Sequence, residues 1–177
     1  MLIVKNQQKG YSLIELVVTI VLTSIIVVVF LTLFSSVQRN STEPVFQVKA
    51  AELGQAYLEE ISLKKYDHAS PAGNGIRCND TGPACSGTLG IDNITPGVAE
   101  TRVNFNDVDD YNNLVESPPA DALGNVRSGF NNFSVSISVS YAGGDLGLAA
   151  QDMKRIEVTV TAPDSTQYVF SQYRGNF

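Results

Sequence analysis

One apolar run near the start of the chain limits what the chain can fold into. No charged side chain occurs from Leu16 through Gln38, and the run is almost unbroken in its apolar character as far as Phe34. At about 1.5 Å of rise per residue, a helix of this length can cross a hydrocarbon layer roughly 30 Å thick. We therefore predict a membrane-spanning helix over residues 11–38.

A carboxylate, that of Glu15, stands at the N-terminal edge of this run. A carboxylate that faces lipid is penalised by kilocalories unless it finds a partner or stays near the interface. The preceding segment carries Lys5 and Lys9 and no acidic residue, which predicts that residues 1–10 stay in the cytoplasm and that the rest is exported. The alternative is a plain signal anchor, in which Glu15 only stabilises the first helical turn.

The residues around the start of the run also contain a candidate cleavage signal. An ordinary secretory signal is cut after its apolar region at an A-x-A-like site, and residues 35–39 lack that pattern. Instead, a short basic leader ends in Gly10 and is followed by Tyr11 and then by Ser12-Leu13-Ile14-Glu15. This segment resembles the class III signal of type IV prepilins and pseudopilins.

The resemblance implies a role for individual residues. A prepilin peptidase would cut between Gly10 and Tyr11, remove residues 1–10 as a leader and methylate the amino group of Tyr11. Glu15 would dock into the fibre by pairing with the positively charged terminus of a neighbouring subunit. The sequence departs from the family pattern at two positions, because Tyr11 replaces the commoner phenylalanine and Thr32 stands where many members carry a helix-kinking proline.

The segment after the apolar run has the pattern of an amphipathic helix. Pro44 predicts a kink or a short break. Beyond it, apolar residues recur at spacings of four and three, namely Phe46, Ala50, Leu53, Tyr57 and Ile61. We expect the polar residues between them, Glu60 included, to face solvent. The helix should end near Lys64 or Lys65.

The last part of the chain has the alternation of strands. Apolar and polar residues alternate over residues 133–141 and 156–161, and residues 167–174 return as a third strand. Short connections predict antiparallel neighbours. The apolar face of this sheet and the apolar stripe of the helix should bury each other. We therefore predict an α+β fold, with the N-terminal helix packed on a C-terminal antiparallel sheet and residues 39–177 as one domain, which is the plan of type IV pilins.

Two cysteines, Cys78 and Cys85, flank a Gly-Pro turn in the irregular segment between helix and sheet. In an exported domain, such a pair is most simply a disulfide that closes a small loop. The rival interpretation is a metal-binding thiolate pair, but the further Cys or His ligands that zinc would need are missing.

An acidic loop follows, with Asp107, Asp109 and Asp110 close together. These oxygens are a weak calcium candidate, because the spacing lacks the central glycine and terminal glutamate of an EF-hand loop. The favoured interpretation is that the acidic side chains bond to nearby backbone amides while Phe105, Val108 and Tyr111 point inward. This loop and residues 155–177 also resemble minor pilins of the mannose-sensitive haemagglutinin (MSHA) type.

Composition argues against several classes of function. The chain has 12 basic and 18 acidic residues and a net charge of −6, which disfavours binding to nucleic acid. Its one histidine, His68, is expected to be a surface residue after the helix, since a hydrolase triad or a histidine metal site needs more convergent groups. We expect neither an enzyme nor a cofactor.

Taken with the resemblance, these observations predict a structural protein. The resemblance implies a minor pilin that waits in the bacterial inner membrane with its domain in the periplasm. The pilus assembly machinery would then add it, with other pilin subunits, to an extracellular MSHA-type pilus that supports adhesion. The alternatives are a pseudopilin of type II secretion and a tip adhesin that binds a surface glycan or protein through residues 69–129.

Overall fold

The computed structural model describes residues 10–40, 43–71, 76–80 and 82–176. These residues fall into two compact units, Met1–Val45 and Phe46–Phe177, and each unit is described by itself. Helix α1 (Leu13–Asn40) belongs to the first unit. Helix α2 (Glu43–Ser62) begins at the end of the first unit and continues into the second.

The helix boundaries agree closely with the sequence pattern. Residues 41–42, next to the predicted interruption, lie outside the described residues. Pro44 lies in the first turn of α2, where its missing N–H is not needed. Helix α2 ends at Ser62, slightly before the predicted end. The chain tightens there, because the Lys64 amide donates to the Ile61 carbonyl at 3.0 Å.

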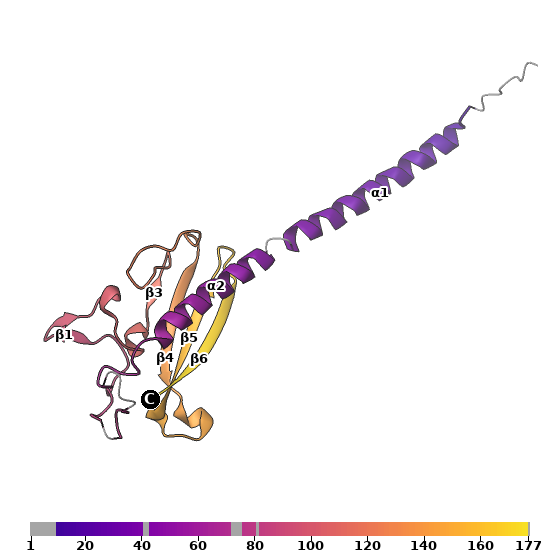
Figure 1. The fold of residues 1–177 in the computed structure, drawn as a ribbon. Coiled ribbons are helices and arrows are strands. Elements are labelled where there is room, and N and C mark those ends of the chain that lie inside the picture. Colours follow the sequence, from indigo (N-terminus) through magenta and orange to yellow (C-terminus); the bar gives the residue numbers. More distant parts are fainter. Residues whose placement is uncertain (1–9, 41–42, 72–75, 81, 177) are drawn as a thin grey trace, which may run out of the picture. The chain divides into compact units, whose positions relative to one another are not determined.

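The second unit contains an antiparallel sheet with the strand order β3-β4-β5-β6 (Figure 1). Its strands are β3 (Val115–Glu116), β4 (Ser134–Tyr141), β5 (Met153–Thr161) and β6 (Gln167–Gly175). The three long strands confirm the prediction from alternation. Strand β3 was not predicted, because two residues are too short to show a period, and the sheet therefore has an additional edge strand.

Helix α2 lies across one face of this sheet (Figure 1), and together they form the core. The helix contributes the predicted stripe, of which Ala50, Leu53, Tyr57 and Ile61 are buried and Phe46 is partly buried. The strands contribute alternate residues, namely Val135, Ile137, Val139, Ile156, Val158 and Val160. Helix and sheet thus bury each other's apolar faces, which confirms the predicted α+β fold.

The segment between helix and sheet carries short elements in place of the expected irregular structure. A small hairpin pairs β1 (Asn93–Thr95) with β2 (Val98–Ala99). Single turns of 3₁₀ helix follow at η1 (Arg102–Asn104) and η2 (Asp109–Tyr111), and two more, η3 (Gly143–Leu146) and η4 (Ala150–Asp152), connect β4 to β5. Lys154 and Glu116, which are described below, lie near opposite ends of β4, because Lys154 pairs with Tyr141 and Glu116 pairs with Val135.

Candidate functional site

The residues before α1 include the expected cleavage point. Gly10 and Tyr11 are exposed, whereas the leader lysines Lys5 and Lys9 lie outside the described residues. A Cβ added at Gly10 would meet no described atom within 4 Å. Packing within this part of the chain therefore does not require a glycine at position 10, and a requirement for one would have to come from another molecule.

Glu15 lies in the first turn of α1, and the residue is exposed. Its backbone carbonyl accepts a hydrogen bond from the Thr19 hydroxyl at 2.6 Å. No side chain among the described residues pairs with the Glu15 carboxylate. A carboxylate in this position interacts favourably with the N-terminal end of the helix dipole, so the helix tolerates it while leaving it free for a partner.

The apolar part of α1 is exposed to the outside of the chain. The 22 residues Leu13–Phe34 are long and apolar enough to cross a membrane, and none of this segment is buried within the chain. Its polar side chains bond back to the helix, because the hydroxyls of Thr23, Ser24 and Thr32 donate to Thr19, Val21 and Val29 carbonyls at 2.8 Å each. These hydroxyl donors are therefore satisfied within the helix, as an apolar environment demands.

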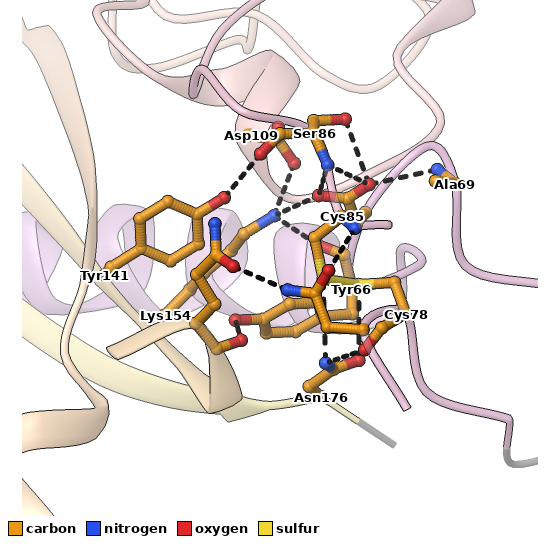
Figure 2. Close-up of a disulfide and its surroundings, with 12 residues drawn as sticks. Tyr66, Ala69, Cys78, Cys85, Ser86, Asp109, Tyr141, Lys154 and Asn176 are labelled. Carbon is orange, nitrogen blue, oxygen red and sulfur yellow. Dashed lines mark hydrogen bonds and ion pairs between the residues drawn. A yellow bond between two sulfur atoms is a disulfide. The ribbon is translucent and has the colours of Figure 1, made fainter. Parts of the chain in front are cut away.

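A second polar centre lies in the globular unit around Lys154 (Figure 2). This side chain is fully buried and points inward from β5. Its ammonium Nζ lies 2.6 Å from Asp109 Oδ1, 2.6 Å from the Tyr66 carbonyl oxygen and 3.4 Å from Asp67 Oδ2. It also lies 4.4 Å from the centre of the Tyr66 ring. Lys154 thus joins strand β5 to the segment after α2 and to the acidic loop.

Asp67 links this centre to the cysteine loop. Cys78 and Cys85 form a disulfide, as the sequence predicts. The next residue, Ser86, donates its amide at 3.1 Å and its hydroxyl at 3.0 Å to Asp67. At the other end of the disulfide loop, the side-chain amide of Asn176 donates to the Cys78 carbonyl at 3.0 Å (Figure 2). The disulfide therefore holds a loop whose end satisfies a buried carboxylate.

The acidic loop bonds mostly to itself. Asp107 Oδ1 accepts the amides of Asp109 and Asp110, and Asp110 Oδ2 accepts those of Asn106 and Asp107. Phe105, Val108 and Tyr111 are buried. These contacts confirm the favoured interpretation, in which the acidic side chains bond to nearby backbone amides. The positively charged partner of Asp109 is Lys154. Burial, a hydrogen bond with Asp109 and the charges of Asp109 and Asp110 raise the pKa of Asp107 well above the ordinary value of a carboxyl group.

The solvent-facing role expected for Glu60 was wrong. Its carboxylate is largely buried and lies 2.6 Å from Arg102 Nη2 and 3.4 Å from Arg127 Nη2. The Tyr111 hydroxyl also donates to it at 2.8 Å. Arg102 in turn contacts Glu116 at 3.0 Å. The helical pattern did not predict the burial of Glu60, because the burying groups come from the segment between helix and sheet. That segment folds over this side of α2 and supplies the charged partners Arg102 and Arg127.

Sequence reasoning also missed Lys154, although a signal was present. Lys154 lies in phase with Ile156, Val158 and Val160, the inward positions of β5. A lysine at an inward position of a buried strand needs a carboxylate partner. The pattern alone did not indicate which carboxylate this was, because Asp67 and Asp109 are far away in sequence.

Comparison with known protein families supports the prediction of a prepilin-like leader. Residues 5–31 match the family model for the prokaryotic N-terminal methylation motif, which includes Gly10, Tyr11 and Glu15. No curated protein and no solved structure matches the chain significantly. The matched motif implies processing by a prepilin peptidase and assembly with pilin subunits. The chain therefore carries the methylation motif of a type IV pilin-like or pseudopilin precursor, followed by an α+β globular unit.

Proposed function

We propose that this protein is a minor pilin. A prepilin peptidase cleaves it after Gly10 and methylates Tyr11, and it is then assembled into a type IV pilus of the MSHA type. There it supports pilus biogenesis and surface adhesion. Before assembly it resides in the inner membrane, with residues 39–177 in the periplasm. The match of residues 5–31 to the methylation motif is the main support for this proposal.

The exposure of Glu15 supports its proposed role in docking. Its carboxylate has no partner among the described residues, so a partner can come from a neighbouring subunit. The methylated amino group of Tyr11 on that subunit carries the opposite charge. Their attraction grows as the local dielectric constant falls, provided that both groups lose their water together. Such a pair sets the axial register of one subunit against the next.

The apolar surface of α1 supports a place in a filament core. Large apolar side chains from Leu13 to Phe34 are exposed in the single chain. Lipid covers this surface before assembly, and α1 helices of other subunits cover it afterwards. Close van der Waals packing drives such helix association, because lipid tails and helix surfaces are equally apolar.

The N-terminal mass spectrum of the protein tests the proposal. The protein would be recovered from membranes and from sheared surface fibres of the native host. We expect a terminus at methylated Tyr11 in both fractions. The Gly10→Val variant should remain uncleaved and absent from fibres, because the added side chain obstructs the peptidase and not the fold of the described chain. An intact Met1 terminus confined to membranes in the unaltered protein would contradict the proposal.

A pseudopilin of type II secretion is the second candidate, because the matched motif is common to both classes. Deletion of the gene separates the two. Loss of surface fibres and of adhesion with normal secretion supports the pilin. Loss of secreted enzymes with normal fibres supports the pseudopilin.

A further inference from the structure

Three side chains of the kind that bind metals converge from separate segments of the globular unit. His68 follows α2, Asp92 precedes β1, and Asp107 lies in the acidic loop. One possible ligand atom from each residue lies within 4.8 Å of those of the other two. His68 Nδ1 and Asp92 Oδ2 are 3.4 Å apart. One ion could therefore contact all three after small side-chain movements.

These residues differ in burial, as expected for a metal site with one buried ligand and two ligands that solvent can reach. Asp107 is fully buried, whereas the side chains of His68 and Asp92 are 52% and 30% exposed. An ion could enter from the imidazole side and keep water ligands there. Asp107 Oδ1 is already held by the amides of Asp109 and Asp110. Such second contacts fix the orientation of a ligating carboxylate.

The other oxygen of Asp107 points to an occupant. Asp107 Oδ2 is buried and receives no hydrogen bond from the described residues, whereas Asp92 Oδ2 has the His68 imidazole beside it. A buried carboxylate oxygen without a donor or cation carries a free-energy cost of kilocalories. The nearby Lys154 ammonium is engaged by Asp109 and Tyr66. A metal ion that contacts Asp107 Oδ2 would remove this cost.

We propose that His68, Asp92 and Asp107 bind a divalent transition-metal ion of the Zn²⁺ class. Two carboxylates neutralise the charge of such an ion, and an imidazole nitrogen is a ligand that Zn²⁺ prefers and Ca²⁺ does not. Asp107 binds the ion as its carboxylate, since a ligating carboxylate must be deprotonated. The ion ties the segment after α2 to the β1–β2 hairpin and to the acidic loop.

Zn²⁺ titration of the full chain in detergent micelles, without a histidine tag, tests this proposal. Binding is measured by competition with a fluorescent zinc indicator. Because the chain has one histidine, NMR reports its ring signals without ambiguity. We expect one Zn²⁺ per chain and a shift of the His68 ring signals. The variants His68→Ala, Asp92→Asn and Asp107→Asn should each bind Zn²⁺ at least about tenfold more weakly.

The controls separate loss of a ligand from loss of the fold. Asp164→Asn removes an exposed carboxylate from the turn between β5 and β6 and should leave Zn²⁺ affinity unchanged. His68 is exposed, so His68→Ala should retain the thermal unfolding midpoint of the unaltered protein. Absence of saturable Zn²⁺ binding would overturn the proposal. Binding that is equal in His68→Ala, or that leaves the His68 signals unmoved, would also overturn it.

Discussion

At the scale of single residues, the charged side chains of Glu15 and Lys154 differ in whether the described chain supplies their partners. Lys154 finds all its partners within the chain, because two carboxylates and a carbonyl surround its ammonium. Glu15 finds none among the described residues. The first charge therefore concerns the stability of the globular unit. We propose that the second concerns association with other subunits.

Removal of the Glu15 charge should block assembly and leave processing intact. We expect Glu15→Ala and the isosteric Glu15→Gln to be cleaved at Gly10 but to be scarce in sheared fibres, because neither can attract a neighbouring amino terminus. Immunoblots of membrane and fibre fractions measure both steps. If Glu15→Gln entered fibres as well as the unaltered protein, charge pairing would be the wrong explanation.

Removal of the Lys154 charge should destabilise the fold. Lys154→Met keeps most of the volume but leaves the buried carboxylates of Asp67 and Asp109 without their cation, which typically costs about 3–5 kcal/mol. The free energy of unfolding from urea titrations would show this. Adding Asp109→Asn should recover part of the loss. Arg155→Met, the exposed neighbour on β5, serves as the control and should change stability by less than about 0.5 kcal/mol.

At the scale of elements, the long periodic segments were predictable and the short ones were not. Helix α2 and strands β4 and β5 each bury one face. The burial of one face produces a periodic pattern of apolar residues that can be read from the local sequence. Strand β3 and the turns near Asp107 depend on partners far away in sequence. The surroundings of Lys154 and Glu60 were missed for the same reason. By contrast, the methylation motif over residues 5–31 could be recognised from the sequence, because it is a local motif.

The disulfide loop is joined to Asp67 by the hydrogen bonds of Ser86. The Cys78→Ser and Cys85→Ser double variant should lower the free energy of unfolding by about 2 kcal/mol, mainly because the open loop gains conformational entropy when unfolded. Urea titrations with and without reductant provide the measurement. Reductant should destabilise the unaltered protein by a similar amount and leave the double variant unchanged. A further effect of reductant on the double variant would contradict this explanation.

At the scale of the whole molecule, the main hydrophobic core and the apolar helix α1 are made of different residues. Every residue of the main core cluster lies between Ala50 and Ala162, so α1 contributes nothing to it. A chain that begins at Glu43 should therefore be soluble without detergent. It should also unfold at the same temperature as the globular unit of the full chain. Circular dichroism compares the two, and aggregation or loss of the cooperative transition in the shorter chain would contradict the prediction.

The position of Lys154 along the chain has a consequence for biosynthesis. The lysine follows Asp67 by 87 residues and Asp109 by 45 residues. Because synthesis proceeds from the N-terminus, both acids emerge well before their cation, and contacts of such long sequence separation form slowly. A chain interrupted before β5 would keep two carboxylates that cannot be buried without a charge of opposite sign. Such fragments should stay open and be degraded, so that complete chains are the ones that persist.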